Sequence, residues 1–229
     1  VYFYTEAGLQ VKPLLLNPNA AVPGGYQPNP FTLAPGASWE IYLPAIPDTE
    51  LPDGRYSVVI ESTARVVAIA NLLGEGASYF NGSYAGFDMG APTFYLPGVV
   101  FNYYGWDSLI SVQNISDVAA NVTVNISCEN GASGTLTFPG IPAKSSHHFD
   151  LETTLPTGFT AATVCNGAAV ITSSGPNIVV VDNQTHPATG KTQSYGGVLD
   201  GSPTVYIPAL YQGYYGWVAS INIQKLNAG

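Results

Sequence analysis

The sequence predicts an all-β protein, and three observations lead to that fold class. Short runs of alternating apolar and polar residues recur along the 229 residues, while the spacing of amphipathic helices is almost absent. Turn-forming residues separate these runs, and the chain contains 25 Gly and 18 Pro. The third observation is that the chain repeats itself. Together these features are typical of β-sandwiches.

The clearest predicted strand lies at residues 121–127. Val122, Val124 and Ile126 alternate there with Asn, Thr and Ser, as in a strand with one buried face. Similar runs predict strands at 58–60, 66–70, 109–113, 135–138, 170–172, 178–181, 204–207 and 220–223. We expect the core of the central part to contain Val112, Val122, Val124, Ile126, Leu136, Phe149, Val170, Ile171, Val179 and Val181.

The internal repeat is the most informative feature of the sequence. Residues 92–106 read PTFYLPGVVFNYYGW and residues 203–217 read PTVYIPALYQGYYGW, at an offset of 111. Two upstream segments match at the same offset: 84–90 with 195–201, and 58–62 with 169–173. LPDG at 51–54 matches LPTG at 155–158 at an offset of 104, so the second copy contains about seven extra residues near 159–167. Residues 35–43 also resemble 142–151.

These matches divide the chain into three parts. Residues 91–201 form one complete repeat. Residues 1–90 form a repeat without its front strands, in which Val1–Tyr4 aligns with Val122–Asn125. Residues 202–229 repeat the front strand pair with no domain behind them. Each end of the chain therefore lacks what the other end has.

The motifs resemble those of a known class of repeat. LPxG, PGxS followed by alternating aromatics, and YxPxxYxxYYGW in a Gly-, Ser- and Thr-rich chain are similar to the tandem immunoglobulin-like β-sandwich repeats of bacterial secreted and surface proteins. The resemblance implies two such repeats, the first incomplete. The arrangement of a sandwich without its front strands and a spare terminal strand also resembles that of donor-strand assembled pilins.

Composition and charge argue against some classes of binding partner. Charged residues make up 9% of the chain, against roughly 25% in ordinary soluble domains, and the formal net charge is −9. This balance argues against binding to nucleic acid or to an anionic membrane. No run approaches the about 20 apolar residues of a membrane helix. Because Val1 is not Met and no signal-peptide pattern follows it, the sequence reads as a processed or excerpted segment. Solubility that rests on Ser, Thr, Asn and Gly favours an extracellular or cell-surface location.

Cys128 and Cys165 are the only cysteines, and they lack metal-ligand spacing. We expect them to form one disulfide, which would lie in the second repeat alone, because the insertion that contains Cys165 has no counterpart in the first. Two buried thiols are the alternative. The predicted oxidising environment favours the disulfide.

Five sequons suggest a glycoprotein. They lie at Asn81, Asn114, Asn121, Asn125 and Asn183. The alternation of strand 121–127 places Asn121 and Asn125 on its outer face. Glycans there would help to keep a charge-poor surface soluble. The alternative is that these are ordinary polar residues in a host that does not use sequons.

The two YYGW segments have two interpretations. Tyr103, Tyr104 and Trp106, and their counterparts Tyr214, Tyr215 and Trp217, lie at junctions between repeats. Packing between repeats is the interpretation we favour, and stacking against sugar rings is the alternative. No catalytic motif is present, and we expect no enzymatic activity, no cofactor and no metal site. His147 and His148 are adjacent, so in a strand they point to opposite faces and do not easily share a metal.

These features predict a structural subunit of an extracellular filament, pilus or surface array. Its partner is another copy of itself, because residues 202–229 of one copy complete the 1–90 repeat of the next. The side chains that alternate toward the interior of the completed repeat are Val205, Ile207, Ile221, Ile223 and Leu226. Alternatively, the 229 residues are one period of a longer chain, with Gly229 joined to the next Val1. The competing function is an adhesin or carbohydrate-binding pair of modules that binds glycans through the YYGW segments.

Overall fold

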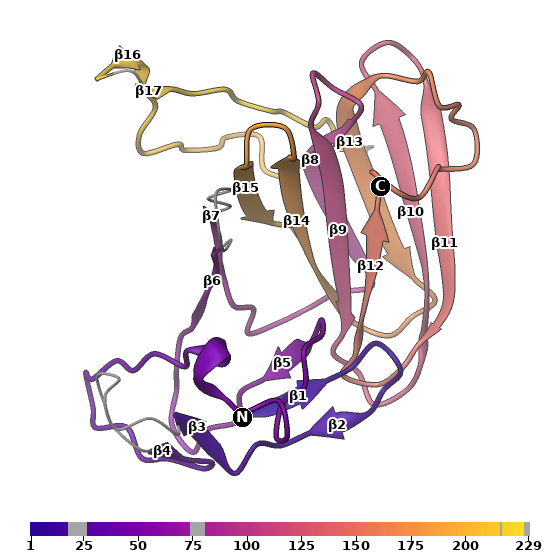
Figure 1. Ribbon diagram of the computed structural model, residues 1–229. Helices are drawn as coiled ribbons and strands as arrows, with labels where there is room; N and C mark the ends of the chain where they lie inside the picture. The colour runs from indigo at the N-terminus through magenta and orange to yellow at the C-terminus, as the bar shows by residue number, and fades with distance from the viewer. Residues whose placement is uncertain (18–26, 74–80, 216, 227–229) are drawn as a thin grey trace.

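The protein is all-β in the computed structural model, as the sequence predicted (Figure 1). The structure describes residues 1–17, 27–73, 81–215 and 217–226. Its only helical element in these ranges is the short 3-10 helix η1 (Leu43–Ala45). No helix among the described residues has the length and apolar character needed to cross a membrane.

Residues 93–196 form two facing antiparallel sheets of four strands each. One sheet has the order β11-β10-β13-β8 and the other β12-β9-β14-β15. The first sheet contains β8 (Thr93–Phe101), β10 (Ala120–Cys128), β11 (Ser133–Ile141) and β13 (Cys165–Ser173). The second contains β9 (Asp107–Asn114), β12 (Ser146–Asp150), β14 (Ile178–His186) and β15 (Lys191–Gly196).

A single core fills the space between these two sheets. Phe94, Leu96, Ile110, Val124 and Ile171 are completely buried in it. Nine of the ten predicted core residues are buried. Val170 is the exception, because it precedes the inward-facing Ile171 in β13 and neighbours in a strand point to opposite faces.

The N-terminal residues form a much smaller unit. A three-stranded sheet has the order β2-β1-β5, from β1 (Tyr2–Tyr4), β2 (Gln10–Val11) and β5 (Ser57–Val59). A two-stranded ribbon, β3 (Leu15–Asn17) with β4 (Gln27–Pro28), lies nearby. The buried cluster of this unit consists of Val1, Phe3, Leu16, Ile46 and Leu51.

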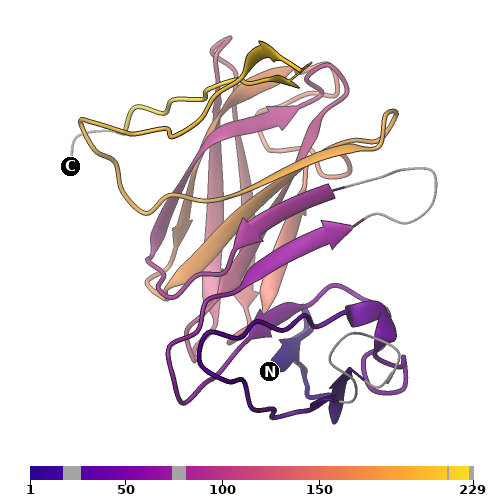
Figure 2. The same cartoon turned by 90° about the vertical axis from the view of Figure 1, so that its left-hand side faces the viewer.

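A second hairpin links this unit to the sandwich. Strands β6 (Ile69–Leu73) and β7 (Asn81–Ala85) pair only with each other, and β7 packs beside β15 (Figure 2). At Gly82 an added Cβ would meet the Ser194 side chain, so β7 approaches β15 closely at this position.

The C-terminal residues differ from the sequence expectation. The predicted strands at 204–207 and 220–223 do not form, and the strands among the described residues of the tail are those of the small hairpin β16 (Gln212–Tyr214) with β17 (Trp217–Val218). The alternating pattern is present, but a strand also needs a neighbouring strand for its hydrogen bonds. In a single chain the tail has no such neighbour.

Candidate assembly interface

Several strands of the N-terminal part have an unpaired edge among the described residues: β2, β3, β4, β5, β6 and β7 each pair on one side only. β5 pairs with β1 on one side only, and β6 pairs with β7 on one side only, within the described residues. Apolar side chains in or next to β5 and β6 are exposed: Val58 in β5 is 40% exposed, Ile60 just after it 44%, and Ile69 in β6 71%. Free edges with exposed apolar residues are sites for pairing with another strand.

The corresponding strands of the central sandwich, β13 and β14, are paired on both edges. At the offset of 111, β5 corresponds to β13, where Ala169 and Ile171 take the places of Val58 and Ile60 and are 1% and 0% exposed. The free edge of β5 corresponds to the edge of β13 that pairs with β8.

The β6–β7 hairpin matches β14–β15 in the same way. Ile69 pairs with Ala85, and Val181 pairs with Gly196, the residue 111 positions after Ala85. Ile69 therefore corresponds to Val181, and the next residue, Ala70, corresponds to Asp182, which lies opposite Ile110 inside the sandwich. The free edge of β6 corresponds to the edge of β14 that pairs with β9.

The strand pairing also corrects one detail of the sequence alignment. Tyr2, Phe3 and Tyr4 pair with Val59, Val58 and Ser57. In the sandwich, the residues equivalent to Val59 and Val58 pair with Asn125 and Ile126. Val1–Tyr4 therefore corresponds to residues 124–127 and not to 122–125, a shift of two residues that keeps the same face of the strand inward.

The segment equivalent to β12 gives independent evidence of a missing neighbour. β12 pairs with β9, with Phe149 opposite Ile110. The matching residues 38–42 are not a strand, although the sequences are similar. Trp39 packs there against Phe31, with ring centroids 4.6 Å apart. Among the described residues, β5 and β6 thus have no strand on the sides where β13 and β14 have β8 and β9.

The C-terminal tail carries the sequence of that missing pair. Its residues 204–212 correspond to β8 and 218–225 to β9. The turn between them also has the same backbone form, since Asn102 and Gly213 have φ of 50° and 65°, and Tyr104 and Tyr215 have φ of 51° and 48°.

Inward positions of β8 and β9 are exposed in the tail. Phe94, Leu96, Ile110 and Val112 are 0% exposed. Their counterparts Val205, Ile207, Ile221 and Ile223 are 74%, 48%, 49% and 88% exposed. These four are also predicted donor residues. The fifth, Leu226, is half-buried and lies close to Gly201.

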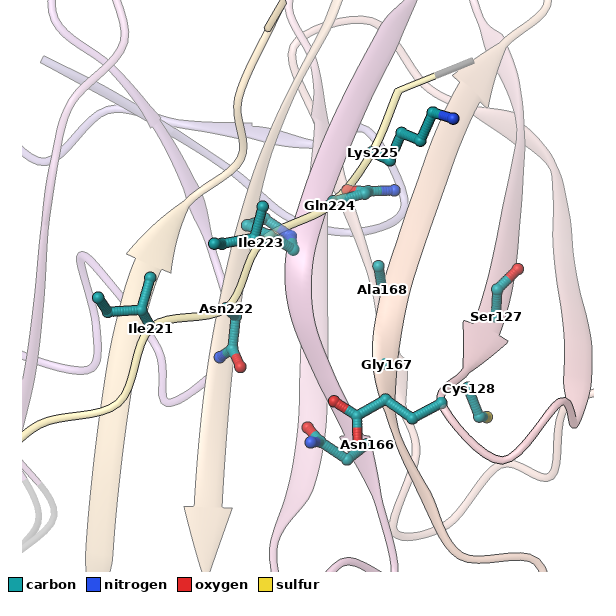
Figure 3. Close-up of a pocket in the computed structure, with 12 residues that line it drawn as sticks. Ser127, Cys128, Asn166, Gly167, Ala168, Ile221, Asn222, Ile223, Gln224 and Lys225 are labelled. Carbon is teal, nitrogen blue, oxygen red and sulfur yellow. The ribbon is translucent and has the colours of Figure 1, made fainter. Parts of the chain in front are cut away.

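The end of the tail rests on the outside of its own sandwich (Figure 3). The Gln224 Nε2 donates a hydrogen bond to the Ala169 carbonyl oxygen at 3.3 Å. Residues 221–225 line a surface pocket of about 270 Å³ together with Pro97 and parts of β10 and β13. Several residues that line the pocket are polar, and one side-chain hydrogen bond joins it to the tail. We therefore interpret the contact between residues 221–225 and the sandwich as a surface contact.

The disulfide joins Cys128 to Cys165, with the Cα atoms 5.2 Å apart. It connects the end of β10 to the start of β13, and both residues are buried. It therefore lies in the second repeat, as expected.

The sequon residues lie in different environments. Asn121 and Asn125 are exposed on the outer face of β10, and Asn81 begins β7. Asn114 is completely buried, and its Nδ2 donates to the carbonyl oxygens of Val118, Ile141 and Pro142. Asn183 is 8% exposed and accepts a hydrogen bond from the Ser194 Oγ. The folded structure therefore leaves no room for a glycan at Asn114 and little at Asn183. A sequon alone does not show whether its asparagine is buried.

The aromatic junction residues do not form one continuous platform. The Trp106 ring meets the His186 ring edge to face, with centroids 5.5 Å apart. Tyr104 and Tyr215 are 83% and 87% exposed. The side chains of Tyr214 and Trp217 lie outside the described part of the structure. Tyr103 is half-buried and meets the Tyr104 ring edge to face.

The two adjacent histidines have separate neighbours. The His147 ring stacks on Phe138, with ring centroids 3.6 Å apart. The His148 Nδ1 lies 2.9 Å from the Ser111 Oγ, on another strand. In the part of the chain that the structure describes, no three His, Cys, Asp or Glu side chains gather as metal ligands.

Sequence reasoning missed a buried carboxyl group. Asp182 is 0% exposed in the interior of the sandwich, where it accepts hydrogen bonds from the Ser108 Oγ at 3.0 Å and the Gln184 Nε2 at 2.8 Å. Its Oδ1 has no hydrogen-bond partner. Burial raises the pKa of Asp182 to about 6, although the hydrogen bonds from Gln184 and Ser108 oppose the shift. The apolar run before Asp182 gave no sign that this residue faces inward.

This carboxyl group gives a testable pH dependence. Because its pKa is higher in the folded state, the fold binds the proton more tightly and loses stability as the pH rises from about 4 to about 6. Between pH 4.5 and pH 7.5 this loss amounts to about 2 kcal/mol, and we expect Asp182→Asn to remove it in urea denaturation at these two pH values. The exposed Asp200→Asn is the control. An equally steep loss in Asp182→Asn would contradict the assignment.

Comparison with known proteins does not place the chain in a family. No family model matches the sequence, and no curated protein matches it. A solved structure with some similarity is the "Crystal Structure of Thermotoga maritima 1070", with a TM-score of 0.40 and 14% sequence identity. The match covers 48% of this chain and 96% of that one.

Proposed function

We propose that the protein is a structural subunit of an extracellular filament, pilus or surface array, built from two tandem immunoglobulin-like repeats. Residues 202–229 of one copy complete the 1–90 repeat of the next copy. The observation that carries this proposal is the set of matched exposures: Val205, Ile207, Ile221 and Ile223 are exposed, whereas their counterparts in the sandwich are completely buried.

The positions of the two partners favour contact between copies. The β16–β17 hairpin lies at one end of the molecule and the β1-β2-β5 sheet at the other, in both views (Figures 1 and 2). A contact between such different surfaces is heterologous, so it propagates into a fibre unless it closes a ring. The disulfide supports an oxidising environment, as expected outside the cell.

Charge substitutions in the tail test the proposal. A variant carrying Ile207→Asp and Ile221→Asp places two carboxylates at positions that must be buried in the joint. We expect it to stay monomeric under conditions in which the unchanged chain forms fibres, by negative-stain microscopy and sedimentation.

The matched control changes outward positions of the same tail. Tyr206→Asp with Asn222→Asp adds the same charge next to the same residues, and we expect fibres to persist. Equal polymerisation of both variants, or a chain that never polymerises, would contradict the proposal. Saturable glycan binding by a chain that stays monomeric, lost in Trp106→Ala, would favour the adhesin.

A further inference from the structure

We infer that the tail enters its partner as a split pair of strands, one in each sheet, and in a fixed register. This inference rests on the proposed function and specifies the joint. Residues 204–212 lie antiparallel to β5, with Ile207 opposite Val58. Residues 218–225 lie antiparallel to β6, with Ile221 opposite Ala70.

The division between two sheets follows from the sandwich. β8 and β9 are consecutive in sequence, but β8 belongs to the sheet of β13 and β9 to the sheet of β14. Among the described residues of the first repeat, β5 and β6 each have one free edge. A single donated strand would fill one of these edges and leave the other unpaired.

The turn of the tail has the length needed to connect two sheets. Residues 102–106 connect β8 to β9 in the sandwich, and residues 213–217 are their equivalents. Tyr214 pairs with Trp217 as Tyr103 pairs with Trp106. The tail therefore already contains the bend that the split arrangement requires.

The register follows from the pairs observed in the complete repeat. Leu96 is opposite Ala169, which at the offset of 111 places Ile207 opposite Val58. Ile110 is opposite Asp182. Asp182 corresponds to Ala70, because Ile69 corresponds to Val181, so Ile221 is opposite Ala70. Both pairs point toward the interior of the completed sandwich, so Ile207 and Ile221, which are exposed in the tail, would be buried there.

Cysteine pairs test each strand separately. One chain carries Val58→Cys with Ile207→Cys, and another carries Ala70→Cys with Ile221→Cys. After mild oxidation we expect each to give a ladder of 24 kDa multiples on a denaturing gel without reductant. The chain without added cysteines is expected to run as a monomer on the same gel.

Controls shifted by two residues keep the same face of each strand. They are Val58→Cys with Val205→Cys, and Ala70→Cys with Ile223→Cys. A shift of two residues moves the Cα atoms by about 7 Å along the strand, beyond the reach of a disulfide. We expect these controls to lose most of the ladder while fibres still form.

The outcomes separate this inference from the proposed function. Fibres with a ladder from only one of the two predicted pairs would show donation of a single strand and overturn the inference alone. Fibres with ladders from the shifted pairs would overturn the register alone. A cross-link that stays within the monomer would place the joint inside one chain and overturn both, as would the absence of fibres. Native material without added cysteines that does not separate into 24 kDa subunits on boiling in denaturant would show that successive repeats are joined covalently. That result would contradict strand donation by a separate second copy.

Discussion

Residues 91–201 produced alone are expected to fold and to unfold cooperatively, whereas residues 1–90 produced alone are expected to lack stable structure. The central sandwich buries 22 residues in one cluster, and the N-terminal unit buries five among its described residues. A core of five residues falls short of what an isolated domain of this length needs. Circular dichroism and thermal melting of the two fragments measure the difference.

The missing strands should restore the first repeat when they are added as a peptide. We expect a peptide of residues 202–229 to induce strand signal in fragment 1–90 and to protect its amides from exchange. The same peptide carrying Ile207→Asp and Ile221→Asp is the control, and it should have little effect. A fragment 1–90 that is already folded without the peptide would refute the idea that its strands are missing.

Removal of the disulfide is expected to cause the largest loss of stability in the central sandwich. The bridge closes a loop of 37 residues, which corresponds to about 3–4 kcal/mol by loop entropy. For a domain of this size we expect the melting midpoint to fall by about 10–20 °C in a chain carrying Cys128→Ala and Cys165→Ala. Calorimetry of both chains measures this difference.

Reductant provides the control for this experiment. It should lower the midpoint of the unchanged chain and leave that of the double alanine variant where it is. An unchanged midpoint in both would mean that the bridge contributes nothing to stability. Because the bridge joins β10 to β13, the exchange protection of β1 and β5 should stay the same.

The all-β class and most of the strands follow from the amino-acid sequence alone. The alternation of Val122, Val124 and Ile126 requires only local geometry, because side chains in a strand point to alternate faces. The repeat at an offset of 111 likewise follows from the residues alone, and it identified the tail as a second copy of the segment that forms β8 and β9.

Other features depend on partners that are distant in the chain, so they become visible only in the folded protein. The alternation at 204–207 predicts a strand, yet no strand forms there because strand hydrogen bonds need a neighbour. Asn114 carries a sequon, but three carbonyl oxygens surround its amide. Asp182 follows an apolar run, and Ser108 on the neighbouring strand β9 donates one of the hydrogen bonds that its buried carboxyl group accepts. Local sequence fixes which way a side chain points along its own strand, whereas burial and pairing depend on what the rest of the chain, or another copy, places opposite it.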